Sequence, residues 1–259
     1  LFATLEEWGI PGVKIDFMDR SDQWMVGYYE RVMKCAARHR LFVDMHGSYT
    51  PKGLYRTYPN LLTYEGVLGM EQGGRCKPEN SNWLPFIRNA VGPMDFTPGS
   101  MFSAQPEDNR STGANPMGTG TRAYQMALYV VFESPLQMLA DNPVLYRREH
   151  PCTEFLAAVP TTWDSLRVLH AACGREVVVA RRKGDKWYVG GITNDRPYTT
   201  EIALDFLPAG RTFTMTSFED GVNADLQATD YRKRVREVDA STVVKVEMVR
   251  NGGWAAVIE

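Results

Sequence analysis

The sequence is poor in cysteine and has no closely spaced cysteine pair. Its four cysteines, Cys35, Cys76, Cys152 and Cys173, are spread along the chain without a CxxC motif. Such spacing is typical neither of a zinc site nor of a disulfide framework. We therefore interpret these residues as small buried side chains, a common role of unpaired cysteine.

Long apolar runs and an excess of positive charge are missing too. No apolar stretch approaches the ~18 residues of a membrane span, and the formal net charge is −2. A nucleic-acid-binding protein usually presents a basic face, which this charge balance does not indicate. The composition, 44% hydrophobic and 23% charged, is ordinary for a globular protein, and we expect neither a nucleic-acid partner nor a membrane span.

The start of the chain carries no recognisable targeting signal. It begins with Leu1 rather than methionine and enters its first predicted strand at Val13. A charged segment followed by an apolar one, the pattern of a signal peptide, does not precede that strand. We expect the sequence to be a fragment of a longer protein.

Short apolar strands alternate with helices in the first part of the chain. Strands are predicted at residues 13–17, 41–45 and 61–65, with weaker signals at 91–96 and 135–140. Helices are predicted at residues 21–39, around 51–55 and at 121–133, the first with Ser21 as its N-cap. This alternation favours parallel β/α units.

Polar residues follow the predicted strands at their carboxyl ends. They are Asp16, His46, Glu65, Asp95 and Asp141. In a (β/α)8 barrel the active site is built at that end of the strands. Five units are too few to close such a barrel, so we predict that residues 1–161 form its second part and that the missing strands lie upstream.

The pattern changes after about residue 162. Short strand-like segments separated by turns are predicted at 164–170, 176–182, 186–193, 199–204, 211–217 and 242–249. Residues 176–191 (EVVVARRKGDKWYVGG) predict a hairpin, because apolar runs flank a Gly-Asp turn. We predict an all-β domain over residues 162–259, a β-sandwich.

The segment KIDFMDR at residues 14–20 is the strongest chemical signal. Strand alternation places Lys14 and Asp16 on one face. A carboxylate at the end of a strand can serve as a glycosidase nucleophile, and Lys14 could keep Asp16 ionised. The alternative is an aspartate that caps the next helix, for which Asp19 is the better candidate.

Lys14 also supports a different class of enzyme, a barrel lyase or aldolase that uses a Schiff-base lysine. Aldolases of phosphorylated sugars usually have an anion-binding glycine loop in their late β/α units. The corresponding part of this sequence does not show one. The glycosidase interpretation is therefore favoured.

Glu65 and Glu71 form a second acidic pair in the loop EGVLGMEQGG. Two carboxylates on one loop can share a hard cation such as Ca²⁺, or one of them can act as a general acid. The alternative is a surface loop with two solvated glutamates. The loop does not match an EF-hand, so its spacing alone does not indicate calcium.

Three segments resemble glycoside hydrolase family 97. They read GVKIDFMDRSDQWMVGYYE, LFVDMHGSYTPKGLYRTYPNLLTYEGVLGMEQ and LPFIRNAVGPMDFTPG, in one order from Gly12 to about Gly99. The resemblance implies an N-terminal β-sandwich, a catalytic (β/α)8 barrel and a C-terminal β-domain, with this chain beginning just before barrel strand four. It also implies a periplasmic or secreted protein.

The resemblance implies a retaining mechanism. Asp16 matches the nucleophile of the retaining members at the end of strand four. Inverting members lack that aspartate and carry a glutamate base directly after the histidine of the strand-five motif, whereas here His46 is followed by Gly47. Glu71 matches the acid/base, and Lys14 and His46 are expected to bind the sugar or orient Asp16.

The resemblance further implies a calcium ion. Glu65 matches one of its ligands, Glu71 is expected close to it, and a further ligand comes from the family's N-terminal domain, outside this chain. The HGS string at residues 46–48 is most similar to α-galactosidases. The alternatives are a β-L-arabinopyranosidase or α-glucosidase of the same family, or an inactive carbohydrate-binding fragment; in each case the partner is a glycoside or oligosaccharide.

Overall fold

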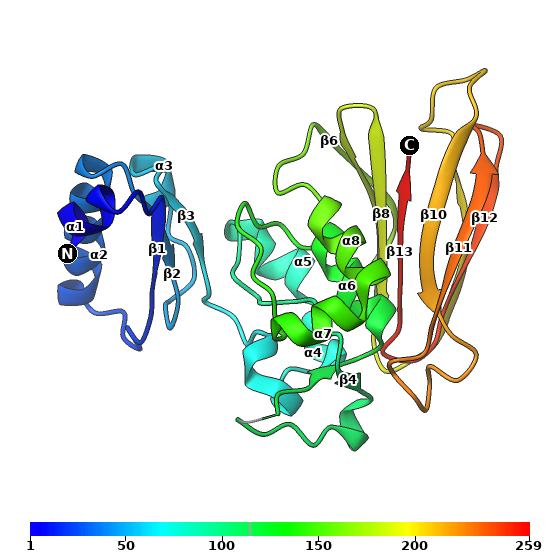
Figure 1. The fold of residues 1–259 in the computed structure, drawn as a ribbon, viewed down its shortest axis with the longest axis horizontal. Helices are drawn as coiled ribbons and strands as arrows, with labels where there is room; N and C mark the ends of the chain where they lie inside the picture. The colour runs from blue at the N-terminus through cyan, green and yellow to red at the C-terminus, as the bar shows by residue number, and fades with distance from the viewer. Residues whose placement is uncertain (114) are drawn as a thin grey trace.

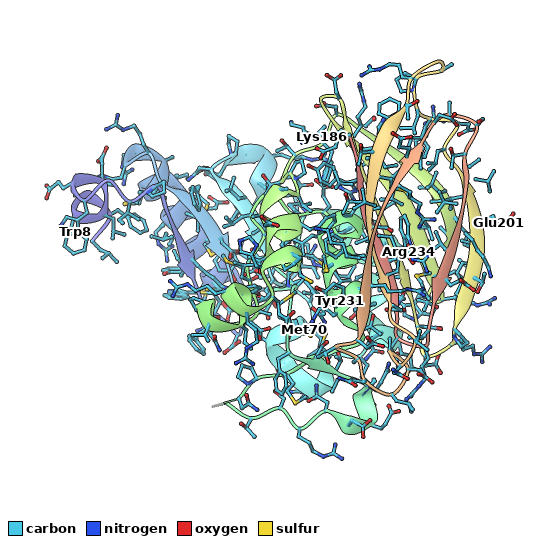
Figure 2. All side chains as sticks on the ribbon, turned by 45° about the vertical axis from the view of Figure 1, so that its right-hand side comes forward. Trp8, Met70, Lys186, Glu201, Tyr231 and Arg234 are labelled. Atoms are coloured by element: carbon cyan, nitrogen blue, oxygen red, sulfur yellow. The ribbon has the colours of Figure 1, made fainter. Side chains whose placement is uncertain are left out.

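The computed structural model describes residues 1–113 and 115–259. Figure 1 shows a small β/α unit at the N-terminal end, a middle region of short helices, and a C-terminal region of long strands. Figure 2 places Trp8 at the outer end of the first unit, Met70 in the middle region and Glu201 on the outer side of the C-terminal strands. No helix in the described part of the chain has the length and apolarity that a membrane crossing requires.

The N-terminal unit is a three-stranded parallel sheet in the order β1-β2-β3. Its strands are β1 (Gly12–Ile15), β2 (Phe42–Met45) and β3 (Leu61–Tyr64), and its helices are α1 (Phe2–Glu7), α2 (Gln23–Arg38) and α3 (Leu54–Thr57). Apolar residues of α2 and of one face of the sheet form a shared core that includes Tyr29, Met33 and Val43. The three stronger strand predictions are confirmed.

The start of α2 differs from the prediction. Asp22, not Ser21, is the N-cap, because its backbone is extended and its Oδ1 accepts a hydrogen bond from the Met25 N–H at 3.1 Å. The alternative cap, Asp19, is also wrong. Asp19 has a φ of 46°, and its own N–H donates to the Gly47 carbonyl at 2.8 Å.

One later segment continues the parallel arrangement beyond β3. Met94 forms a parallel bridge with Tyr64, so the weak signal at 91–96 corresponds to an isolated bridge rather than a full strand. The Met94 N–H in turn donates to the Glu133 carbonyl at 3.1 Å. The predicted strand at 135–140 is wrong, because the chain bends at Pro135, whose backbone has no N–H to donate to a neighbouring strand.

Short elements and one buried helix fill the middle region. They are η1 (Met70–Arg75), α4 (Pro78–Ser81), α5 (Leu84–Ile87), η2 (Asn89–Val91), β4 (Ser103–Ala104), η3 (Pro106–Asp108), β5 (Gly118–Thr119), α6 (Arg122–Val131), α7 (Pro143–Arg148) and α8 (His150–Ala158). Every residue of α6 is buried, and Thr121 caps it by accepting the Tyr124 N–H. The prediction of a helix over 121–133 is confirmed.

The C-terminal region consists of antiparallel strands in two sheets. Six strands follow the order β11-β10-β13-β8-β7-β6, and β12 pairs with β9. The strands are β6 (Ser165–Ala172), β7 (Glu176–Lys183), β8 (Lys186–Thr193), β9 (Tyr198–Ala203), β10 (Phe213–Asp220), β11 (Tyr231–Val238), β12 (Val243–Met248) and β13 (Gly253–Ile258). The predicted hairpin is confirmed as β7–β8.

Helix α6 packs closely on the six-stranded sheet at β8 and β13 (Figure 1). Two glycines make this approach possible. A Cβ added at Gly253 would lie 2.3 Å from the Tyr124 Cα, and one at Gly190 would lie 2.9 Å from the Ala127 carbonyl oxygen. The middle region is thereby joined tightly to the C-terminal sheet.

Candidate functional site

The polar residues that follow the parallel strands meet at one edge of the sheet. Lys14 of β1 pairs in register with Asp44 of β2, and Asp16 and His46 come directly after these two strands. Glu65 follows β3, and its N–H donates to the Met45 carbonyl at 2.7 Å. Parallel strands bring their carboxyl ends together, as the barrel prediction requires.

Asp95 joins two of the predicted residues. Its Oδ2 lies 2.8 Å from the Lys14 Nζ and 2.8 Å from the His46 Nδ1. Burial alone would raise the pKa of Asp95, but the hydrogen bonds with His46 and Lys14 outweigh burial and hold the pKa below its ordinary value. Asp95 is therefore an ionised acceptor beneath the site.

His46 lies between Asp95 and two glutamates. Its Nε2 is 2.9 Å from the Glu71 Oε2 and 3.3 Å from the Glu65 Oε1. Burial lowers the pKa of His46, yet the hydrogen bonds to Asp95 and Glu71 prevail and raise the pKa to about 10. His46 is thus an imidazolium that donates from both ring nitrogens.

The two glutamates have opposite electrostatic surroundings. The hydrogen bond from His46 lowers the pKa of Glu71, with Lys14 Nζ contributing from 3.6 Å. Burial raises the pKa of Glu65, and the charges of Glu71 and Asp16 add to that rise. The Thr97 hydroxyl donates to the Glu71 Oε1 at 3.3 Å and so helps to hold that side chain.

Asp16 lies against the glycine that follows His46. A Cβ added at Gly47 would be 2.8 Å from the Asp16 Oδ1, and Gly47 has a φ of 56°. The same oxygen accepts the Phe17 N–H at 2.5 Å, in a turn where Phe17 has a φ of 63°. A glutamate cannot replace Gly47 here without displacing the Asp16 carboxylate.

Glu65 and Glu71 fit one part of a calcium site. Their carboxylates converge on a single His46 nitrogen, and Ca²⁺ prefers carboxylate oxygens. However, Ca²⁺ takes about six to eight oxygen ligands. Among the residues that the structure describes, no three acidic, histidine or cysteine side chains are arranged to hold a metal. This chain supplies two carboxylate ligands at most from the predicted pair.

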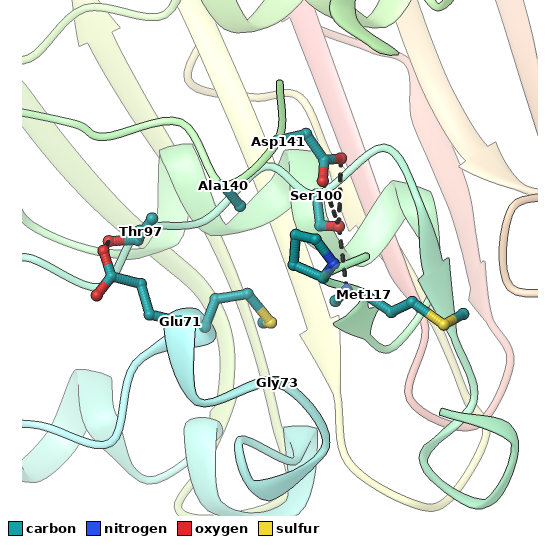
Figure 3. A pocket seen from close by; sticks show the side chains of 10 residues that line it. Glu71, Gly73, Thr97, Ser100, Met117, Ala140 and Asp141 are labelled. Carbon is teal, nitrogen blue, oxygen red and sulfur yellow. Dashed lines mark hydrogen bonds between the residues drawn. The ribbon is translucent and has the colours of Figure 1, made fainter. Parts of the chain in front are cut away.

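A cavity of about 170 Å³ adjoins Glu71. Figure 3 shows Glu71 and Thr97 at one end of it and Ser100 with Asp141 at the other, with Met117 on the same side as Ser100. The Asp141 carboxylate accepts the Phe102 N–H at 3.0 Å and the Ser100 hydroxyl at 3.3 Å. Asp141 therefore stabilises the wall of this cavity, and these hydrogen bonds are to Ser100 and Phe102 rather than to Asp95 or His46.

Four predicted site residues are joined by direct contacts, namely Lys14, His46, Glu65 and Glu71, and Asp16 lies beside them. Asp95 and Thr97 were not among the site residues predicted from the sequence. The position of Asp95 after a predicted strand was a signal that could have included it.

Arg88 was also not predicted, although it holds the backbone on which two site residues, Glu65 and Asp95, are placed. Its buried guanidinium donates to the carbonyls of Tyr64, Glu65 and Gly66 and to those of Gly92 and Pro93, at 3.0–3.3 Å. It thereby ties the end of β3, where Glu65 begins its loop, to the segment that leads to Asp95.

Two family models match the chain. The model described as "Glycoside hydrolase 97" matches residues 1–67, and the model described as "Glycosyl-hydrolase 97 C-terminal, oligomerisation" matches residues 162–259. Together they cover both ends of the chain, including Asp16, His46 and Glu65.

Curated relatives agree with these models. The chain is 43% identical over 258 residues to a "Retaining alpha-galactosidase" of Bacteroides thetaiotaomicron, a match that covers 98% of this chain and 39% of that protein. It is 35% identical over 254 residues to a "Probable retaining alpha-galactosidase" of Streptomyces bingchenggensis, covering 98% and 37%. The chain thus spans about two fifths of the length of these relatives.

Solved structures show the same fold. A family 97 enzyme of Pseudoalteromonas sp. strain K8, solved in complex with acarbose, matches with a TM-score of 0.88 at 33% identity, over 100% of this chain and 43% of that one. A beta-arabinopyranosidase matches with a TM-score of 0.81 at 29% identity, over 99% and 40%. The predicted fold class, part of a (β/α)8 barrel followed by a β-sandwich, is confirmed, and the chain belongs to glycoside hydrolase family 97.

Proposed function

We propose that the complete protein carrying this sequence is a retaining, exo-acting α-galactosidase. The observation that carries the proposal is the Asp16 carboxylate packed against Gly47, next to a His46–Glu71 pair 2.9 Å apart. This arrangement offers a nucleophile and an acid/base on one side of the sheet. The α-galactosidase names of the two curated relatives support the choice of sugar.

In the proposed reaction Asp16 attacks the anomeric carbon and forms a covalent glycosyl-enzyme. Glu71 protonates the departing oxygen and later removes a proton from the attacking water. A general acid needs a proton at its carboxyl group, yet the pKa of Glu71 is lowered. The hydrogen bond that His46 donates to Glu71 favours the ionised carboxylate, so this hydrogen bond must weaken when Glu71 takes up the proton that it gives to the leaving oxygen.

Lys14 contributes charge rather than covalent chemistry. A Schiff-base lysine must lose its proton near neutral pH, which requires a lowered pKa. Here burial lowers the pKa of Lys14, but the hydrogen bond to Asp95 outweighs it, so the pKa is raised overall. This favours a role in orienting Asp95 and the substrate over the lyase or aldolase alternative.

We further propose that Glu65 and Glu71 contribute to a Ca²⁺ site of the complete protein. The bound ion would supply positive charge beside the acid/base. The fit of two converging carboxylates supports this, while the other ligands would come from outside this chain. A periplasmic or secreted location remains part of the proposal, on the grounds of the family.

Assays of the complete protein on three substrates test the proposal. We expect hydrolysis of p-nitrophenyl α-galactoside to exceed that of p-nitrophenyl β-L-arabinopyranoside and of p-nitrophenyl α-glucoside. The second substrate matters because a beta-arabinopyranosidase is among the similar structures. The third matters because family 97 structures with panose and acarbose are similar as well. A preference for either of the other two substrates would change the assigned sugar. Failure to hydrolyse any of the three substrates would contradict the proposal that the protein is a glycoside hydrolase.

A further inference from the structure

A buried carboxyl group in the middle of β2 has no role in the mechanism above. Asp44 is 1% exposed, and no hydrogen-bond donor among the described residues reaches either of its carboxyl oxygens. Its register partner on β3, Thr63, is also fully buried with an unpartnered hydroxyl. An unpaired buried carboxylate would cost several kcal/mol, on the order of the ion-burial penalty, so this group requires an explanation.

A second buried carboxyl group, that of Asp95, adjoins Asp44. Both are carboxyl groups, and two carboxylates in contact cannot both remain ionised, so one of them carries a proton. Asp95 already accepts hydrogen bonds from two donors, the Lys14 Nζ and the His46 Nδ1, each at 2.8 Å. These donors keep Asp95 ionised, which leaves the proton on Asp44.

Two further observations agree with a neutral Asp44. Its surroundings disfavour charge, since burial raises the pKa of Asp44 to about 9. Lys14, the cation opposite it in the strand register, gives its ammonium group to Asp95 instead. A carboxylic acid in this position has one O–H to donate and an ionised acceptor beside it.

We propose that Asp44 is a positioning residue, a neutral carboxylic acid that donates a hydrogen bond to Asp95 and so fixes the carboxylate that orients His46 and Lys14. Asp44 touches none of the predicted reacting groups, and it acts through Asp95 and His46 on Glu71. Its catalytic effect rests on the proposed function, but its protonation does not.

Three variants of the complete protein separate this role from simple packing. Asp44→Asn keeps a donor, because the amide N–H can replace the O–H, and its kcat should stay close to that of the wild type. Asp44→Leu removes the donor, and its kcat should fall about 10–100-fold, the usual cost of losing an orienting partner, with KM little changed. Thr63→Val, a loss of another buried polar atom in the same layer, should leave kcat unchanged.

Infrared difference spectroscopy tests the protonation without any substrate. At neutral pH the wild-type minus Asp44→Asn difference spectrum should show the C=O stretching band of a protonated, buried carboxylic acid; subtraction of the variant removes bands from other buried carboxyl groups such as Asp220, whose pKa burial raises to about 7. The proposal is overturned if that difference spectrum contains no such band. It is also overturned if Asp44→Leu turns over as fast as the wild type, or if Asp44→Asn is as slow as Asp44→Leu.

The two proposals fail in distinguishable ways. A wild-type protein without glycosidase activity would contradict the proposed function, and the infrared band would still decide the state of Asp44. Should Asp44→Leu not fold, the Asp44→Asn variant supplies both the kinetic and the spectroscopic result.

Discussion

Two aspartates three residues apart have different surroundings in this structure. Asp16 is half-buried and its carboxylate packs against Gly47, beside the His46–Glu71 pair. Asp19 is exposed and occupies a left-handed turn after the strand. Only the first of them lies where a nucleophile could face the proposed acid/base.

Asp16→Gly in the complete protein should abolish ordinary turnover, because the glycosyl-enzyme cannot form. Added azide should restore part of the activity and give a galactosyl azide of inverted configuration, since the small anion can occupy the vacated space. Product analysis by NMR measures this.

Asp19→Asn is the matched control for that experiment. Asparagine tolerates a positive φ about as well as aspartate does, and Asp19 does not cap α2, so activity and melting temperature should stay near those of the wild type. Azide rescue of the Asp19 variant, together with an active Asp16→Gly, would show that the wrong aspartate is assigned.

Glu65→Gln tests the proposed calcium ligand. The substitution keeps the size of the side chain and its hydrogen bond from the Gly47 N–H, but removes the charge that a hard cation requires. Calorimetric titration of the complete protein with Ca²⁺ should show markedly weaker binding. The exposed Glu79→Gln on α4 should bind like the wild type, and unchanged affinity in Glu65→Gln would refute the assignment.

Among the secondary-structure elements, the end of β3 depends on a single arginine. Arg88 donates to carbonyl oxygens of both segments that meet in the Tyr64–Met94 bridge, and a planar guanidinium can serve several acceptors at once. A lysine has one nitrogen and cannot reach the same set.

Arg88→Lys should therefore lower the melting temperature of the complete protein. Leaving these carbonyls without donors should lower the free energy of unfolding by about 1–3 kcal/mol. Calcium affinity should fall too, because Arg88 holds the backbone of Glu65, the proposed ligand. Arg110→Lys, at an exposed arginine whose hydrogen bonds within the described residues go to nearby carbonyls, is the control and should have little effect. Equal melting temperatures for both variants would contradict the role of Arg88.

Elements with a strong local pattern could be predicted from the sequence. The apolar strands β1 to β3 and the β7–β8 hairpin were located to within about two residues, because their periodicity and turn residues act locally. The strand β11 was missed, since its sequence YRKRVREV is charged at most positions. It forms because β10 pairs with its full length, which no local pattern reveals.

The site could be predicted only in part for the same reason. Residue type and position after a strand pointed to Asp16, His46 and Glu65. The contacts of Asp95 with Lys14 and His46 join residues far apart in sequence, and they depend on strand order. Periodicity carries no information about such order.

On the scale of the whole molecule, the middle region and the C-terminal sheets are linked through α6. Gly253→Ala should lower the melting temperature, because the added Cβ would meet the backbone of Tyr124 at 2.3 Å. Gly27→Ala, within α2, should raise it, since alanine stabilises a helix interior by about 1 kcal/mol and its Cβ would meet only a flexible arginine side chain. A Gly253→Ala protein as stable as the wild type would contradict the close packing of α6.

The central claim is that the complete protein hydrolyses α-galactosides with retention through Asp16. Proton NMR recorded during the first turnovers of p-nitrophenyl α-galactoside tests it most directly, before the free sugar equilibrates between its anomers. We predict that α-galactose appears first, because two displacements at the anomeric carbon restore the starting configuration. Initial formation of β-galactose would mean a single displacement by water and would contradict the assignment of Asp16 as nucleophile.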